Sequence, residues 1–398
     1  MGENPENIIR SWNRQTHFNT GPVAENKLVP PDFYRIATPY VQTWREEACK
    51  ASLDFGSTNH SYYIPEGLMV ISALYLQVKL PAISGATYKD YVGIYPIRSI
   101  RLLSGGQEVY NCDYRLFLAD HCEGLSNECL KIFGETYLGK EDTATGDART
   151  VLCPILLPNS AYLDRAGPST RGHGIWPCQL GNNNRLEIQL TMNAGNYLTS
   201  DTAVTPVLAA GALSWLYHEV KMTSANNRAY SKQLGTYSII NRRFTELSNG
   251  WQDYATPDAN VVWNINQPQG VVTEVMLIAV PTAATEDRYE FNYVKPTKFK
   301  ILADTICQKD LDSTAKVRAE LWSNGFCPPT DFPSPGRLCF AAHVGKAHHT
   351  YTGGYNMQLV STIQYEFAFA VAVKWKLIAV QMQRVRIKPD GQVRATLD

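Results

Sequence analysis

The 398-residue sequence lacks a charge imbalance, a long apolar run and a leading apolar segment. Lysine and arginine together number 37, and aspartate and glutamate also number 37, so the net charge is zero. A neutral chain gives no reason to expect nucleic-acid binding over its whole surface, and low net charge favours self-association. No apolar run is long enough to span a membrane, and the polar N-terminus is unlike a secretion signal.

Paired cysteine motifs are also missing. The nine cysteines are scattered and include no CxxC. Their odd number favours free thiols, and therefore synthesis in a reducing compartment such as the cytoplasm. Cys122 and Cys129 are the only closely spaced pair, and a disulfide between them is the alternative.

The sequence contains none of the common catalytic motifs. GxGxxG, GxxxxGK[ST], HExxH and GxSxG are all absent, so we predict that the protein is not an enzyme and has no catalytic or cofactor-binding residues. His218 and Glu219 are adjacent in an expected strand, where neighbouring side chains point to opposite faces and cannot easily act as a pair. Asp304, Asp310 and Asp312 have no partner motif.

One histidine cluster is the place where a metal could bind. His343, His348 and His349 lie close together in sequence, but no cysteine or carboxylate beside them has the spacing of a zinc ligand. Cys327 or Cys339 could approach only through the fold. We interpret the segment as a solvated loop and predict no metal.

Strict two-residue alternation identifies the strands. Residues 74–80 and 367–377 each place large apolar side chains on one side of an extended chain. We predict that 367–377 is one long strand and that Phe369, Val371 and Val373 are buried. Residues 96–103 and 107–110 flank Gly105 and Gly106, which indicates a hairpin. The alternating side chains are Leu74, Leu76, Val78 and Leu80 in the first segment, and Phe367, Phe369, Val371, Val373, Trp375 and Leu377 in the second.

The pattern divides the chain into an arm and two all-β units. Residues 1–40 have no regular period, but their apolar side chains, Ile8, Ile9, Trp12 and Phe18 among them, suggest an arm that orders against a neighbour. Strand patterns stop at residues 226–236, where we place a boundary. Each half has about eight short strands and one helix, which predicts two sandwiches. The predicted domains are 1–40, 41–228 and 229–398, and the predicted helices are 114–133 and 308–322.

The order of motifs in the first half resembles a known family. The motifs are residues 64–71, the Val-Lys-Leu-Pro-Ala of 78–82, the Ile-Arg-Ser-Ile and Gly-Gly-Gln-Glu of 97–109, the proline-flanked strand 153–158 and the Tyr-His-Glu-Val-Lys-Met of 217–222. Over residues 60–225 this order is similar to that of the double jelly-roll major capsid proteins of tailless icosahedral DNA viruses. The long insertion at residues 159–181 departs from the family pattern.

The resemblance implies an all-β fold of two consecutive eight-stranded jelly-roll sandwiches with short helices in the long loops. It also implies homotrimers that act as pseudo-hexagonal capsomers and tile an icosahedral shell. Expected partners are other copies and neighbouring capsomers, with minor capsid or penton proteins and an underlying membrane as further candidates, and no specific nucleic-acid site. The expected location is the virion capsid, after synthesis in the host cytoplasm or another reducing compartment.

Two rival functions fit the same strand pattern. A spike, receptor-binding or carbohydrate-binding β-sandwich protein would expose an aromatic platform, for which Trp176, Trp251 and Trp322 are candidates. A β-sandwich hydrolase would draw a carboxylate pair from separate strands, which one sequence cannot reveal.

Overall fold

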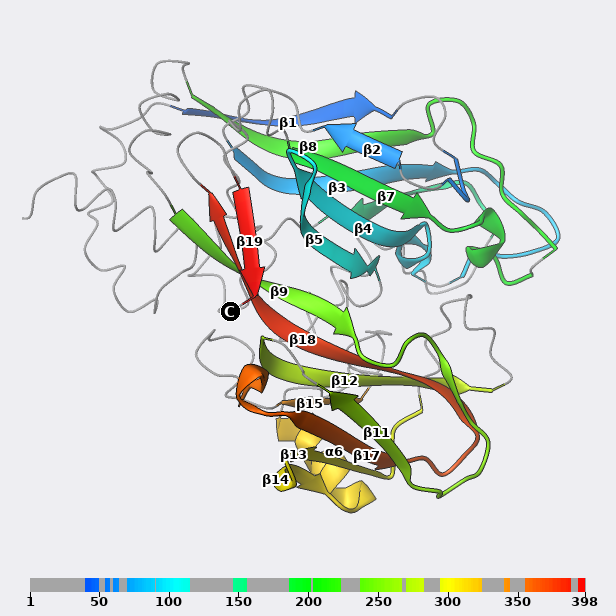
Figure 1. The fold of residues 1–398 in the computed structure, drawn as a ribbon. Helices are drawn as coiled ribbons and strands as arrows, with labels where there is room; N and C mark the ends of the chain where they lie inside the picture. The colour runs from blue at the N-terminus through cyan, green and yellow to red at the C-terminus, as the bar shows by residue number, and fades with distance from the viewer. Residues whose placement is uncertain are drawn as a thin grey trace, which may run out of the picture. The chain divides into compact units, whose positions relative to one another are not determined.

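The described part of the chain, in the computed structural model, consists mainly of antiparallel strands (Figure 1). Contacts divide the chain into two compact units, and the changeovers within the described residues lie at Asn241–Arg242, Gln383–Arg384 and Ala395–Thr396. The expected boundary at residues 228 and 229 lies outside the described residues and stays a prediction. The described residues are 40–49, 54–57, 60–63, 70–89, 91–114, 146–155, 186–201, 203–222, 237–266, 270–282, 294–323, 340–343, 355–387 and 393–397.

The first sandwich consists of two four-stranded sheets. One sheet has the order β1 (Tyr40–Ala48), β8 (Leu213–Met222), β3 (Val70–Leu80) and β6 (Arg149–Pro154). The other has the order β2 (His60–Tyr63), β7 (Leu186–Met192), β4 (Ile97–Ser104) and β5 (Gln107–Asp113). Short 3-10 turns, η3 (Val92–Ile94) and η5 (Gly195–Tyr197), lie in its connections.

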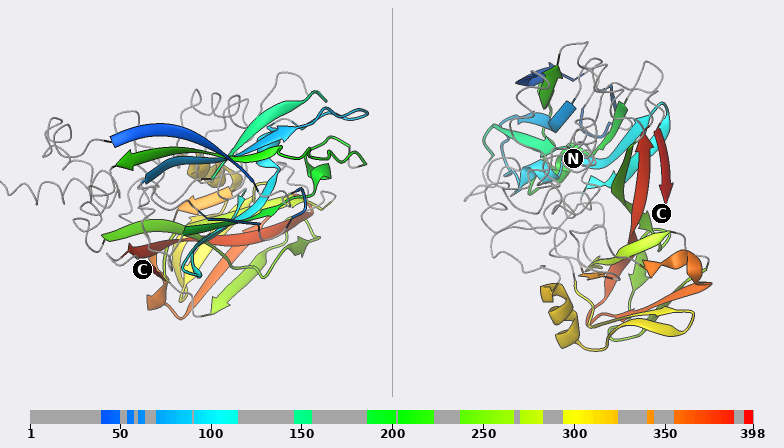
Figure 2. Two further views of the ribbon diagram at one scale, coloured as in Figure 1. Left: turned by 90° about the horizontal axis from the view of Figure 1, so that it is seen from above. Right: turned by 90° about the vertical axis from the view of Figure 1, so that its left-hand side faces the viewer.

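The second sandwich repeats this arrangement. One sheet has the order β10 (Gln252–Tyr254), β18 (Val373–Ile387), β12 (Val271–Pro281) and β15 (Phe340–His343). The other has the order β11 (Val261–Asn266), β17 (Thr362–Ala368), β13 (Lys298–Ala303) and β14 (Ile306–Leu311). In the first of these sheets, β9 (Tyr237–Glu246) and β19 (Val393–Leu397) also pair with β18, and β16 (Tyr355–Asn356) pairs with β12; Figure 2 shows β19 alongside β18 at the C-terminus.

Both sandwiches have the same strand order. When the eight strands of each set are counted along the chain, omitting β9, β16 and β19, both sets pair as 1-8-3-6 in one sheet and 2-7-4-5 in the other. Two facing sheets with this order form a jelly roll. The structure therefore confirms the expected pair of eight-stranded jelly rolls over the described residues, although the two halves share no evident sequence repeat.

Aromatic side chains join the two sheets of each sandwich. In the first, the rings of Tyr62 on β2 and Trp215 on β8 stack with centroids 4.4 Å apart. The expected stripe on β3, Leu74 to Leu80, is buried beside them. In the second, Trp375 on β18 meets Trp263 on β11 and Phe367 on β17 at 5.3 and 4.8 Å. Alternation thus places these side chains in the cores as predicted.

The expected single strand over residues 367–377 is wrong. Strand β17 ends at Ala368, and β18 begins at Val373 in the opposite sheet. The hydroxyl of Tyr254 accepts a hydrogen bond from the backbone N–H of Phe369 and donates to its carbonyl oxygen, so the reversal is fixed at its start. Phe369 and Val373 are buried as predicted, but Val371 lies in the turn and is 48% exposed.

The expected helix over residues 308–322 is only partly correct. Residues up to Leu311 belong to β14, which pairs with β13, and α6 (Thr314–Ser323) follows. Val317 is the buried anchor of this helix, and Asp312 forms an ion pair with Lys316 at 2.7 Å beside its first turn. The other expected helix, 114–133, lies outside the described residues apart from Tyr114.

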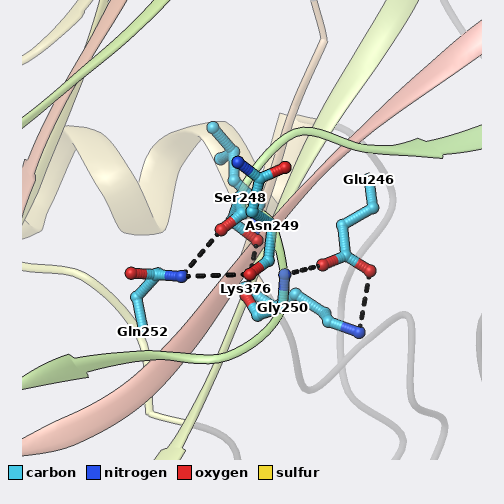
Figure 3. A network of polar contacts seen from close by, with 7 residues as sticks. Glu246, Ser248, Asn249, Gly250, Gln252 and Lys376 are labelled. Atoms are coloured by element: carbon cyan, nitrogen blue, oxygen red, sulfur yellow. Dashed lines mark hydrogen bonds and ion pairs between the residues drawn. The ribbon is translucent and has the colours of Figure 1, made fainter.

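A polar network holds the interruption between β9 and β10 (Figure 3). Ser248 is fully buried, and its hydroxyl accepts from the N–H of Leu377 at 3.1 Å and donates to the carbonyl oxygen of Gly250 at 2.9 Å. Glu246 forms an ion pair with Lys376 at 2.9 Å and accepts from the N–H of Gly250. Gln252 donates to the carbonyl oxygen of Ser248 at 2.8 Å. These bonds replace the ladder bonds that the interrupted strand cannot make.

We expect Ser248→Ala to lower the free energy of unfolding by about 1–3 kcal/mol, because it leaves the buried N–H of Leu377 without an acceptor. Urea unfolding followed by circular dichroism measures the change. Ser84→Ala is the matched control, since Ser84 is exposed. An equal midpoint for the two variants would show that the Ser248 hydroxyl adds nothing.

Candidate assembly surface

The described residues include no group of three or more His, Cys, Asp or Glu side chains that could hold a metal. His343 contributes its backbone to β15, but its side chain is outside the described part of the chain, as are His348, His349, Cys327 and Cys339. The prediction that this segment binds no metal therefore stays a prediction.

The four described cysteines, Cys49, Cys112, Cys153 and Cys307, are free thiols. Burial raises the pKa of Cys49 to about 12, with a smaller contribution from the charge of Glu47. Burial also raises the pKa of Cys153, which donates to the carbonyl oxygen of Gly93 at 3.1 Å. Both thiols stay protonated near neutral pH and therefore react poorly. Cys122 and Cys129 lie outside the described residues.

The three aspartates considered from the sequence have local partners. Asp304 accepts from the backbone N–H groups of Ser361 and Thr362, and Asp312 pairs with Lys316. Asp310 lies on β14 directly opposite Lys300 of β13. The structure does not bring these carboxylates into an acid–base pair. His218 and Glu219 occupy successive positions of β8, and their side chains are outside the description.

Two aromatic side chains are prominently exposed on the first sandwich. Trp44 of β1 is 55% exposed and Tyr63 of β2 is 47% exposed. Strands β1 and β2 are edge strands of the two sheets (Figure 1). The Tyr62 hydroxyl links them by donating to Glu47 at 3.0 Å. Neither aromatic could be recognised from the sequence, because neither belongs to a motif and exposure depends on which strands end a sheet.

The surroundings of Trp44 hold it in a defined position. Its ring stacks on buried Tyr75 with centroids 6.2 Å apart. Next to it, Glu46 accepts from Ser214 at 2.7 Å and from Gln77 at 3.2 Å. A fixed aromatic surrounded by satisfied polar groups has the composition of a protein–protein contact. We call Trp44 and Tyr63 the aromatic edge.

A polar ladder crosses the outer face of the β2-β7-β4-β5 sheet. Ser61 and Gln189 donate to Glu187 at 2.5 and 2.9 Å, Arg101 donates to Gln189 at 3.4 Å, and Arg101 pairs with Glu108 at 3.0 Å. All four strands contribute. This face is polar and internally satisfied, so it is suited to water or to a hydrated contact.

The equivalent sheet of the second sandwich carries similar chemistry. Gln364 donates to Glu366 at 2.7 Å on β17, which is the counterpart of β7. Lys300 on β13 lies opposite Glu366, and Asp310 follows on β14. The recurrence makes the two sandwiches alike in surface chemistry as well as in topology.

The aromatic platform expected of a carbohydrate-binding protein is not supported at Trp251. This side chain is half-buried, and the ammonium of Lys376 lies 5.7 Å from its ring centroid. Trp176 and the side chain of Trp322 are outside the described part of the chain. No described helix is long and apolar enough to cross a membrane.

Comparisons with known proteins place this architecture. No protein-family model and no curated protein matches the sequence. Among solved structures, the chain is similar to PBCV-1 VP54 fitted into a reconstruction of the virophage Sputnik, with a TM-score of 0.65, 10% identity and coverage of 91% of this chain and 97% of that one. The Faustovirus major capsid protein gives a TM-score of 0.60 at 9% identity, covering 96% and 97%.

The mavirus major capsid protein is also similar, with a TM-score of 0.56, 10% identity and coverage of 95% of this chain and 93% of that one. Identities this low show the fold and not the activity. The coverage includes both sandwiches and nearly the full length of each neighbour. The chain therefore has the double jelly-roll fold found in the major capsid proteins of tailless icosahedral viruses.

Proposed function

We propose that this protein is a viral major capsid protein whose copies form homotrimeric, pseudo-hexagonal capsomers of an icosahedral shell. The observation that carries the proposal is the repeated 1-8-3-6 and 2-7-4-5 strand order within one chain. Three copies supply six topologically equivalent sandwiches, which suit a six-sided tile. The similar structures named as major capsid proteins cover both sandwiches.

The surface chemistry agrees with a structural role. The aromatic edge offers anchors for a neighbouring copy, and zero net charge avoids long-range repulsion between closely packed copies. The partners are then other copies and neighbouring capsomers, with minor capsid or penton proteins and an internal membrane as further candidates. The protein acts in the virion, and its free thiols suit synthesis in a reducing compartment.

The domain division belongs to the same proposal. Residues 41–228 form the first jelly roll, residues 229–398 form the second, and residues 1–40 form an arm. The apolar residues of the arm, including Ile8, Trp12 and Phe18, order against a neighbouring copy. Deletion of residues 1–40 then leaves folded trimers that assemble poorly, and normal shells from the truncated chain would contradict the arm's role.

The oligomeric state of the purified full-length chain tests the proposed function. We expect sedimentation equilibrium to give three times the chain mass of 44.5 kDa, and electron microscopy to show closed particles at high concentration. A stable monomer that binds a glycan array would instead support the spike or carbohydrate-binding alternative. A monomer without assembly or ligand would contradict the capsid role.

A further inference from the structure

The turn between β13 and β14 has an unusual backbone. Asp304 and Thr305 have φ values of 45° and 75°. The equivalent turn of the first sandwich, between β4 and β5, uses Gly105 and Gly106 with φ values of 55° and 82°. Glycine adopts such angles freely, whereas a β-branched threonine does so only under strain. The second sandwich therefore keeps two unfavourable residues where glycine would suffice.

The Asp304 side chain explains why this position is not glycine. Its carboxylate accepts from the N–H of Ser361 at 3.0 Å and from the N–H of Thr362 at 2.9 Å. These two backbone hydrogen bonds hold the pKa of the exposed Asp304 carboxyl below its usual value, and the bond from Thr362 has the larger effect. The strained turn is thereby fastened to the segment that enters β17.

That segment is fixed on its other side as well. In η7 (Met357–Leu359), the Asn356 side chain accepts from the N–H of Gln358 at 3.0 Å. Met357 is buried, and its N–H donates to the carbonyl oxygen of Gly270 at 3.0 Å. The backbone around Leu359 is therefore fixed at both ends by specific bonds.

Two aliphatic side chains project from these two fastened segments. Leu359 is 81% exposed and Ile306 is 66% exposed, and each lies two residues from the Asp304–Ser361 hydrogen bonds. Single exposed aliphatic residues are common and need no explanation. Here, however, several hydrogen bonds fix the backbone beside both residues, which is the preorganisation that a contact surface needs. We call Ile306 and Leu359 the apolar tip.

The charges around the apolar tip indicate the kind of partner. Residues 304–308 and 356–362 include no lysine or arginine, and the carboxylate of Asp304 is their only charge. Surfaces that bind lipid headgroups usually combine apolar side chains with basic ones. A neutral aliphatic tip is instead suited to an apolar depression on a protein, and in a shell of identical chains the neighbouring protein surface is another copy.

We propose that the apolar tip is a contact element through which one copy of this chain binds an apolar surface of a second copy. The inference rests on the proposed capsid function and adds a specific surface to it. Asp304 and Thr305 position the tip and do not themselves contact the partner.

The test compares assembly of full-length variants. We expect Ile306→Thr with Leu359→Ser to keep the wild-type unfolding midpoint, because both side chains are exposed, and to raise the concentration required for assembly by about tenfold or more. Val207→Ser is the matched control, since Val207 is 74% exposed on the first sandwich and lies outside the two segments that carry the apolar tip. It should assemble as the wild type does.

A second variant separates positioning from contact. Asp304→Gly with Thr305→Gly gives this turn the glycine pair of the first sandwich, so the hairpin can form. The carboxylate bonds to the N–H groups of Ser361 and Thr362 are lost, and only the backbone bond from residue 304 to the Thr362 carbonyl oxygen stays. We expect folded protein that also assembles at a higher concentration than the wild type. Assembly unchanged in this variant would contradict the positioning role of Asp304.

Three outcomes decide the inference. Wild-type shells together with unchanged assembly of the double tip variant would overturn the apolar tip but not the capsid function. A wild-type chain that never assembles would overturn both. Wild-type flotation with phosphatidylcholine vesicles that the tip variant loses would assign the tip to lipid and overturn a contact between copies. Light scattering over a concentration series supplies the assembly measurement.

Discussion

We expect replacement of Phe367 by alanine to lower the free energy of unfolding by about 3–5 kcal/mol. Phe367 is fully buried in the second sandwich, and its ring lies 4.8 Å from Trp375, 5.8 Å from Phe369 and 6.4 Å from Phe299. Removal of the ring leaves a cavity among three aromatic side chains that belong to both sheets and the turn between them. Urea unfolding monitored by circular dichroism measures the loss.

Val371 supplies the control for Phe367. It lies four residues further along the same apolar stripe, but it is exposed in the turn between β17 and β18. We expect Val371→Ala to change stability by no more than about 0.5 kcal/mol, and Val371→Asp to fold as well. A large loss from either substitution would show that residues 367–377 form one buried strand after all.

We expect Trp215→Ala to destabilise the first sandwich by about 3–5 kcal/mol. Trp215 is fully buried on the central strand β8 and stacks on Tyr62 of the opposite sheet. Its loss removes the stacking contact with Tyr62 that joins the two sheets. The same unfolding measurement applies.

Trp44→Ala is the matched control, because it removes the same side chain from an exposed site in the same sheet. We expect it to keep most of the stability and to weaken association between copies, since Trp44 belongs to the aromatic edge. If Trp44→Ala were as unstable as Trp215→Ala, the aromatic edge would be part of the fold and not a contact surface.

Much of the fold could be predicted from short-range patterns. Alternating apolar residues identified β3, and the glycine pair identified the β4–β5 hairpin, because each signal lies within a few residues. The second hairpin was missed because its turn uses Asp304 and Thr305, which are not typical of a tight turn. Residues 308–311 were consequently assigned to a helix.

The prediction of one long strand over residues 367–377 was wrong for a different reason. Four residues, 369–372, connect β17 to β18, and an even number preserves the alternation across the reversal. Phe367, Phe369 and Val373 are therefore all buried, although they belong to two sheets and the turn between them. A period of two shows which side chains face the core but cannot show where a strand changes sheet when no glycine or proline marks the turn.

The candidate surfaces could not be predicted, because exposure depends on distant pairing. Trp44 and Trp215 lie on paired strands of one sheet, but β1 is an edge strand and β8 is a central one. The register also places the two side chains on opposite faces of the sheet. In the same way, the apolar tip depends on Asp304 meeting Ser361, which is 57 residues away in the sequence.

The strand order also sets the sequence of events during synthesis. In the first sandwich, β1 pairs with β8, so Tyr40 cannot pair within its sheet until Met222 has been synthesised. In the second, β10 pairs with β18, so Gln252 cannot pair until Trp375 has been synthesised. Until the last strand of each jelly roll leaves the ribosome, a sheet with an apolar face has no central strand. Such long-range pairing makes folding slow and leaves nascent chains prone to aggregate.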